Sequence, residues 1–203
     1  MEINIPLIPG YYYHVFNRGN NRQNIFIEAR NYDYFLRQYI KYINPVAETM
    51  AYCLLRNHFH LLICIRVEKD LCDLENPESR SLTPEQVLQA FTNFFNSYAK
   101  GINQTYHRTG SLFQKGFRRI QVTSDRQFLA LIDYIHRNPQ KHGFTEDYRS
   151  YPYSSYGALI STQPTQIERD RVLEWFGGRD GLKEFHATMD DWKQIAEAVR
   201  DDD

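Results

Sequence analysis

Two histidines in the segment Asn57-His58-Phe59-His60 have the spacing of a metal-binding pair. They open an apolar run that predicts a β-strand over residues 58–67. Side chains of a strand alternate between its faces, so both imidazoles point the same way, about 7 Å apart along the strand. Phe59 points to the opposite face, where it can anchor the strand in a core. The alternative is two exposed strand histidines without a metal, because this spacing also occurs by chance.

A tyrosine near the end of a predicted helix could supply a nucleophile. The segment DYIHRNP places Tyr134 and Asn138 four residues apart, on one face of the helix. A phenol can attack a phosphodiester, and a carboxamide oxygen suits a hard ion such as Mg²⁺ or Mn²⁺. The chain has 15 tyrosines, so a packing role for Tyr134 is the alternative. His136 and His142 lie close by and are interpreted as phosphate contacts, helix-end charges or structural residues.

The hydropathy pattern predicts an α+β fold with the element order β-α-β-β-α-β-α. Strands are expected over residues 11–17, 49–55, 58–67 and 117–123, and Arg56-Asn57 predicts a hairpin turn between the second and third. Helices are expected over residues 29–44, from Thr83-Pro84 to about residue 104, and from Ser124 or Asp125 to Asn138-Pro139. The first six elements form the βαββαβ, or ferredoxin-like, pattern, and the helix with Tyr134 is an addition to it. Two further helices are expected over residues 166–176 and 180–199.

The composition indicates a cytoplasmic protein with one sizeable core. Of the 203 residues, 42% are hydrophobic, and no apolar stretch approaches the length of a membrane span. The first ten residues lack the features of a signal peptide. Three cysteines without a CxxC pair fit a reducing compartment, with Cys53 and Cys64 inside apolar runs as buried thiols. Neither a membrane partner nor a nucleotide cofactor is expected.

Charge is distributed unevenly along the chain. The net charge is −1, but residues 100–141 contain eight basic and only two acidic residues, a local balance of +6. The last 39 residues contain eleven acidic and six basic residues, a balance of −5. A basic middle beside an acidic end indicates a localised site for a polyanion, although a solvated charged surface would give the same count.

Three motifs in register resemble one known family. NHFHLL, DYIHRNPQKHG and YPYSSYG resemble the single-tyrosine HUH transposases of the insertion-sequence 200/605 group, and the resemblance covers roughly residues 10–157. Within that group the chain most resembles the REP-associated tyrosine transposases. The resemblance implies that His58 and His60 bind Mg²⁺ or Mn²⁺, that Tyr134 is the nucleophile, and that Asn138 lies beside the metal. Minimal relatives act as dimers with composite sites, so a homodimer and a monomer both stay open.

The resemblance also implies single-stranded DNA or DNA hairpins as partners, cut through a 5′-phosphotyrosine intermediate and rejoined without ATP. The candidate DNA contacts are the basic residues Arg18, Arg22, Arg56, Lys115, Arg118, Arg119 and Arg137. Residues 1–157 are expected to form the catalytic domain and residues 158–203 a C-terminal helical extension. Two other functions are kept: a non-catalytic module that binds single strands through surface aromatics, and a phosphoesterase that activates water.

Overall fold

A computed structural model describes residues 5–68 and 81–188 of the chain. It contains a four-stranded antiparallel sheet in the order β2-β3-β1-β4, in which neighbouring strands are hydrogen-bonded. The strands are β1 (Tyr12–Arg18), β2 (Ala47–Leu55), β3 (His58–Ile65) and β4 (Arg118–Gln121). Together with the two helices that connect them, they confirm the predicted α+β, ferredoxin-like order. Cys72 and the loop around Pro77 lie outside the described residues.

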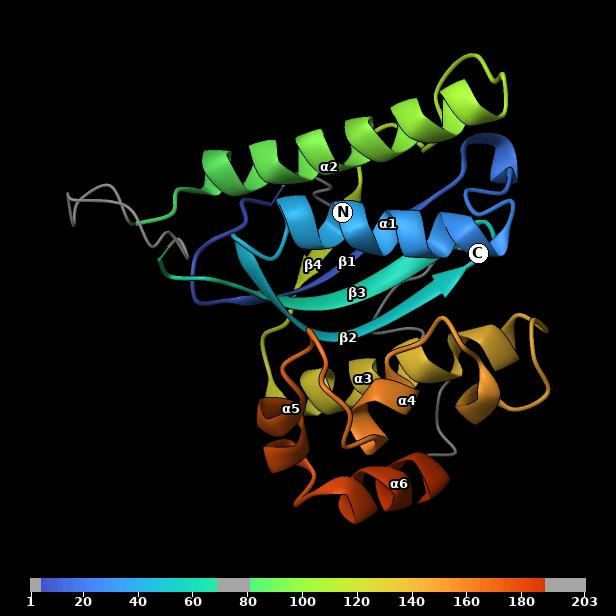
Figure 1. Cartoon of the computed structure of the whole chain (residues 1–203). Helices are drawn as coiled ribbons and strands as arrows, with labels where there is room; N and C mark the ends of the chain where they lie inside the picture. The colour runs from blue at the N-terminus through green and yellow to red at the C-terminus, as the bar shows by residue number, and fades with distance from the viewer. Residues whose placement is uncertain (1–4, 69–80, 189–203) are drawn as a thin grey trace.

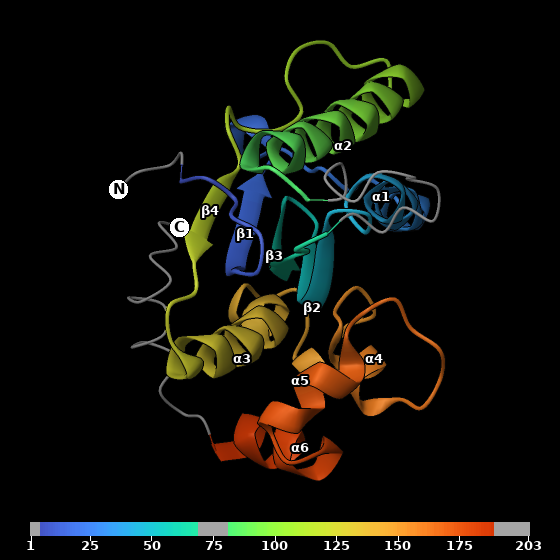
Figure 2. The same cartoon turned by 90° about the vertical axis from the view of Figure 1, so that its left-hand side faces the viewer.

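Helices cover both faces of the sheet (Figures 1 and 2). One face carries α1 (Ala29–Tyr42) and α2 (Pro84–Thr105). The other carries α3 (Asp125–Lys141), with α4 (Tyr156–Ile160) and α5 (Arg169–Trp175) beside it and α6 (Arg179–Thr188) beneath them. Within the described residues no helix is both long and apolar enough to cross a bilayer.

Local sequence signals explain where α2 begins. The Thr83 hydroxyl accepts from the backbone N–H of Gln86, and the Gln86 side chain accepts from the N–H of Thr83, as the capping-box spacing predicts. Pro84 occupies the first helical position, where a missing N–H costs nothing. The predicted hairpin is also confirmed, since β2 and β3 pair in register on either side of Arg56 and Asn57.

The prediction that the third long helix ends at Asn138-Pro139 is wrong, because α3 continues to Lys141. Pro139 lacks an N–H and therefore leaves one carbonyl of the preceding turn without its helical bond. The backbone bonds around it persist, from His142 N to the carbonyl of Asn138 and from Phe144 N to the carbonyl of Pro139. The extra residues place Lys141 two turns after Tyr134 on the same side of the helix.

The C-terminal part of the chain also contains more short helical elements than predicted. The segment YPYSSYG, residues 151–157, is expected to be a turn-rich connector, but a short helix, α4, begins at Tyr156, and a 3-10 turn at Tyr148–Ser150 precedes the segment. The helix expected from residue 166 begins at Arg169, and the second expected helix is described only as far as Thr188. Val172, Leu173 and Leu182 share one apolar cluster with Ile132 and Ile135 of α3, so the extension packs directly on the helix with Tyr134.

The two faces of β3 belong to two different hydrophobic clusters. Phe59, Leu61 and Ile63 pack toward α1 and α2, where rings of Phe35 and Phe94 lie among them. Leu62 and Cys64 pack toward α3, with Ile132 and Ile135. Every residue of β3 is buried as a result. Cys53 and Cys64 are buried free thiols, as the sequence predicts.

Phe59 should therefore contribute strongly to folding. We expect Phe59→Ala to lower the free energy of unfolding by about 3–5 kcal/mol, because it leaves a cavity behind the histidine strand. The matched control is Phe144→Ala, whose ring is 39% exposed and whose loss should cost less than about 0.5 kcal/mol. Urea unfolding followed by circular dichroism measures both, and equal losses in the two variants would contradict the expectation.

Candidate active site

The histidine pair lies on the side of β3 that faces α3. His58 pairs with Arg18 and His60 with Phe16 of β1, while Phe59 packs in the cluster on the opposite face. The predicted alternation is therefore present. The two imidazole rings are perpendicular, with centroids 5.2 Å apart, and their exposed fractions are 5% and 0%. Two buried imidazoles therefore lie next to each other at this place.

Helix α3 brings the other two predicted residues to this place. The Asn138 Oδ1 atom lies 3.2 Å from His58 Nε2, and the Tyr134 ring lies 5.5 Å from the His60 ring, centroid to centroid. The four-residue spacing of Tyr134 and Asn138 puts both on the face of α3 that packs on the sheet. Residues distant in sequence thus meet within a single chain, in the constellation that the motifs predict.

Each imidazole is held through one ring nitrogen. His60 Nδ1 lies 3.0 Å from His14 Nε2, and His58 Nδ1 lies 2.7 Å from Asn57 Oδ1. Burial, with help from neighbouring positive charge, holds the pKa of His60 well below its usual range, and burial lowers the pKa of His14 to about 3. These two rings are therefore neutral at physiological pH, and a neutral imidazole has a lone pair for a metal.

The sequence-based reasoning missed His14. Its strand, YYYHVFN, was expected, but the contact depends on how β1 pairs with β3. In that register His14 lies opposite Leu62 and next to Phe16, which faces His60. A histidine on the same face as the pair was the available signal, although the register could not be read from the sequence.

The residues fit the implied metal ion. Two ligands about 2.1 Å from one ion and at right angles are about 3 Å apart, close to the 3.2 Å between His58 Nε2 and Asn138 Oδ1. Imidazoles oriented by a second partner are the usual arrangement at metal sites. No cluster of three His, Cys, Asp or Glu side chains with metal-site geometry exists in residues 5–68 and 81–188. The protein would therefore offer two imidazoles and an amide oxygen, and leave other positions to water or substrate.

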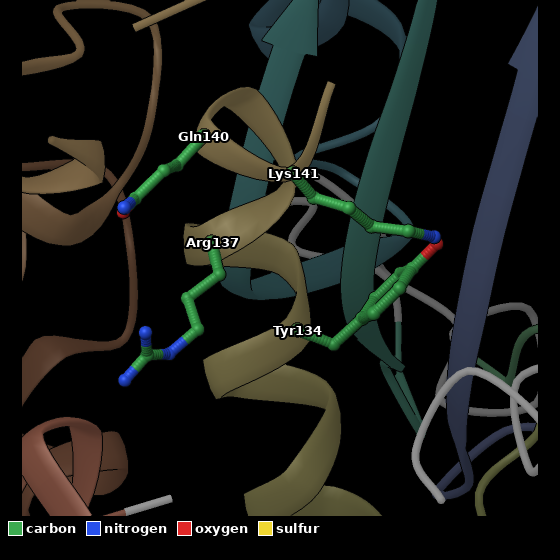
Figure 3. Close-up of a pocket in the computed structure, with 4 residues that line it drawn as sticks. All are labelled: Tyr134, Arg137, Gln140 and Lys141. Atoms are coloured by element: carbon green, nitrogen blue, oxygen red, sulfur yellow. The ribbon is translucent and has the colours of Figure 1, made fainter. Parts of the chain in front are cut away.

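A cation lies beside the predicted nucleophile. The Lys141 ammonium is 5.3 Å from the centroid of the Tyr134 ring, and Figure 3 shows it at the hydroxyl end of that ring. Tyr134, Arg137, Gln140 and Lys141 line a cavity of about 250 Å³ on α3. The sequence-based reasoning did not single out Lys141, because the predicted helix stopped before it.

A comparison with curated proteins identifies the family. A curated Haemophilus influenzae protein named as a REP-associated tyrosine transposase is 30% identical over 139 residues, which cover 67% of this chain and 70% of that protein. The chain belongs to the REP-associated tyrosine transposase family. A solved structure of a REP-associated tyrosine transposase bound to a REP hairpin superposes with a TM-score of 0.60 at 16% identity, covering 82% of this chain and 90% of that one. It supports the same fold. No protein-family profile matches the chain.

Most of the basic residues predicted to contact DNA gather near one end of the sheet of this REP-associated transposase homologue. Arg18 ends β1, and the turn with Arg56 is tied to the loop after β1, where the N–H of Gly19 donates to the carbonyl of Asn57. Arg22 and Lys115 are exposed, and the N–H of Gln114, next to Lys115, donates to the carbonyl of Arg18. Arg118 lies opposite Phe16 and stacks over its ring. We call Arg18, Arg22, Arg56, Lys115 and Arg118 the basic edge.

Arg119 and Arg137 lie elsewhere and are engaged in the fold. Arg119 is 8% exposed, donates to the carbonyl of Ile5 and lies over the ring of Phe117. Arg137 forms an ion pair with buried Asp133 and donates to the carbonyl of His186. Both stay predictions as DNA contacts, but their guanidinium groups already have protein partners.

The two other histidines of the motif have different surroundings. His136 is fully buried and bonded to Ser155 and His186, which explains it as a structural residue rather than a phosphate contact. The ring of His142 lies 5.0 Å from that of His58, at the edge of the site. Of the two, only His142 lies close to the predicted metal ligands.

Buried neutral histidines should make the metal-free protein sensitive to acid. Burial lowers the pKa of His186 to about 4 and that of His14 to about 3, from an ordinary 6.5, and His60 and His136 shift the same way. Below pH 6.5 the unfolded chain therefore binds protons that the folded chain does not, so stability is lost as pH falls from 6.5 toward 4. Burial raises the pKa of Asp133 from 3.8 to about 6, which opposes the trend, but four imidazoles outweigh one carboxyl.

We expect the free energy of unfolding to fall by at least ~2 kcal/mol between pH 7 and pH 5. Urea titrations in the presence of a chelator measure this. A stability that is constant or higher at pH 5 would contradict the neutral state of the buried rings.

Proposed function

We propose that this REP-associated transposase homologue is a metal-dependent endonuclease and strand transferase for single-stranded DNA, with Tyr134 as its nucleophile. The observation that carries the proposal is the meeting of Tyr134, His58, His60 and Asn138 at one place within one chain. A tyrosine that served only packing would have no need of two buried imidazoles and an amide beside its ring. The bacterial cytoplasm, on the nucleoid, is the compartment in which such a protein meets its substrate.

Tyr134 would act on the scissile phosphate by in-line attack. The phenolic oxygen forms a bond to phosphorus and the bond from phosphorus to the 3′-oxygen breaks, so the products are a 5′-phosphotyrosine and a 3′-hydroxyl. The phenol loses one proton and the leaving oxygen gains one. Because the covalent link preserves the phosphodiester energy, a 3′-hydroxyl of another strand can reverse the attack without ATP.

The bound Mg²⁺ or Mn²⁺ would polarise the phosphate and stabilise the charge that develops on it. His58, His60 and Asn138 would hold it, and His14 and Asn57 would keep the two imidazoles oriented. Lys141 would favour the phenolate form of Tyr134 through its adjacent positive charge. Burial of the tyrosine, which is 2% exposed, would limit the access of competing water.

The proposed substrate is a DNA hairpin beside a single-stranded cleavage site. The solved relative is bound to a REP hairpin, and the basic edge of this chain ends next to His58, where Arg18 pairs with it across the sheet. Phosphate contacts there would fix the register of the strand relative to the metal. Since one chain contributes all four residues, we propose a site that is complete within one subunit.

The two competing functions fit the site less well. A non-catalytic module that stacks bases on its sheet needs one open sheet face, whereas here α1 and α2 cover one face and α3 the other. A phosphoesterase that activates water would not need a tyrosine at the histidines. The same covalent-adduct assay separates all three functions.

Substituting Tyr134 tests the proposal directly. Incubation with a hairpin that carries a single-stranded extension and Mn²⁺ should give a denaturant-resistant protein–DNA adduct in the native protein. Tyr134→Phe should abolish the adduct because the attacking oxygen is gone, and His58→Ala should reduce it at least 100-fold. The control Tyr11→Phe, on a ring that is 49% exposed, should leave it unchanged. An adduct of normal yield in Tyr134→Phe would refute Tyr134, and cleavage without any adduct would favour the water mechanism.

Lys141 should affect the rate of attack rather than DNA binding. We expect Lys141→Met to slow adduct formation about tenfold at pH 7, the effect of removing one well-placed charge, and Lys141→Arg to recover part of the rate. Lys100→Met, on the exposed side of α2, is the charge-matched control. Single-turnover kinetics with saturating hairpin measure the rate, and an unchanged rate in Lys141→Met would remove Lys141 from the mechanism.

A further inference from the structure

A chain of buried hydrogen bonds connects the sheet, the helix with Tyr134 and the C-terminal extension. It runs from β2 through the loop before α4 and through α3 to α6. The N–H of Tyr52 donates to Ser155 Oγ, Ser155 Oγ lies 2.9 Å from His136 Nε2, His136 Nδ1 lies 2.9 Å from His186 Nε2, and His186 Nδ1 lies 2.9 Å from the carbonyl of Leu182. We call these contacts the His136–His186 chain.

The tautomers of the two histidines in the His136–His186 chain can be assigned from its last acceptor, the carbonyl of Leu182. The carbonyl of Leu182 can only accept, so His186 carries its proton on Nδ1 and accepts at Nε2. His136 therefore donates from Nδ1 to His186 and accepts at Nε2 from the hydroxyl of Ser155, which itself accepts from Tyr52. Every bond then runs in one direction between neutral groups. If either ring adopted its other tautomer, two donors or two acceptors would face each other.

Burial makes this arrangement hard to replace. Ser155, His136 and His186 all have an exposed fraction of 0%, so a group that lost its partner would find no water. Leaving a buried donor or acceptor unsatisfied costs more than the bond itself contributes. Arg137 adds a second link from α3 to α6, because it pairs with Asp133 and donates to the carbonyl of His186.

The His136–His186 chain contacts α3 on the side opposite Tyr134 and Asn138. His136 lies midway between Tyr134 and Asn138 in sequence, and at 100° per residue its side chain leaves the helix about 160° from each of them. Its partner on α6 therefore sets how α3 is turned about its own axis. A small rotation would move the Tyr134 ring and the Asn138 amide together, relative to His58 and His60 on the sheet.

We infer that His186 is a positioning residue: by accepting the hydrogen bond from His136, it fixes the rotation of α3 and so the orientation of Tyr134 and Asn138. The inference rests on the proposed function for its consequence in catalysis, but not for the rigidity of α3. It gives the C-terminal extension a role in the reaction although α6 contributes no residue to the metal site.

Two substitutions at position 186 distinguish the positioning of α3 by His186 from a role of His186 in stabilising α6 alone. In His186→Gln the amide oxygen reaches the place of Nε2 and can accept from His136, whereas the bond to Leu182 is lost. In His186→Asn the amide reaches the place of Nδ1 and keeps the bond to Leu182, whereas the acceptor for His136 is lost. Lys183→Ala, on the exposed side of α6, is the control.

We expect His186→Asn to slow single-turnover adduct formation at least tenfold, to weaken Mn²⁺ binding to the DNA-free protein at least threefold, and to speed amide hydrogen exchange in residues 125–141. The affinity for the hairpin should stay within twofold, because the basic edge is untouched. His186→Gln should recover adduct rate, Mn²⁺ affinity and exchange to within threefold of the native protein.

Native behaviour of His186→Asn, or a His186→Gln variant as impaired as His186→Asn, would overturn the inference. If His186→Asn does not fold cooperatively, His136→Gln decides, since its amide reaches the place of Nε2 near Ser155 and the donor to His186 is lost: a folded variant with native rate and native exchange in α3 would also overturn it. Hydrogen exchange needs neither metal nor DNA. A failure of the tyrosine chemistry would therefore appear in the adduct assay of the native protein and leave the exchange result to judge the positioning role.

Discussion

Burial of β3 on both faces is the constraint on which the rest of the structure depends. Because its side chains alternate and none is exposed, one set must meet α1 and α2 and the other must meet α3. A ferredoxin-like sheet with helices on one side would leave His58 and His60 in water. Here α3 closes over them, and the same packing that hides two imidazoles delivers Tyr134 and Asn138 to them.

Burial of the His58 and His60 imidazoles has chemical consequences. The nitrogens of a buried ring need hydrogen-bond partners, and His14 and Asn57 meet this need for one nitrogen of each histidine. The nitrogens on the other side of the rings face the space that α3 covers, where a metal ion would complete the arrangement. The low dielectric that disfavours an isolated charge would also strengthen the attraction between a bound cation and a phosphate. Stability and the proposed catalysis thus depend on the same burial.

The sequence carries the local rules of this fold but not its tertiary register. The alternation at His58-Phe59-His60, the capping box at Thr83 and the four-residue spacing of Tyr134 and Asn138 depend on neighbours in the chain, and all were predictable. His14 was missed because its contact depends on the pairing of β1 with β3. Lys141 was missed because Pro139 was expected to end the helix. Charge counting could not distinguish Arg119, held in the fold, from Arg22, which is exposed.

The two sides of α3 have separate roles in the proposed mechanism. The side with Tyr134 and Asn138 faces the sheet, and the side with His136 faces the extension, so the helix is held between two packed layers. A tyrosine that forms and later resolves a covalent link must keep its aim through both steps, because the second attack comes from a 3′-hydroxyl at the same phosphorus. Directional hydrogen bonds resist rotation of a helix better than apolar contacts, which tolerate sliding. The His136–His186 chain, in the middle of an apolar layer, would therefore keep the proposed nucleophile in its orientation.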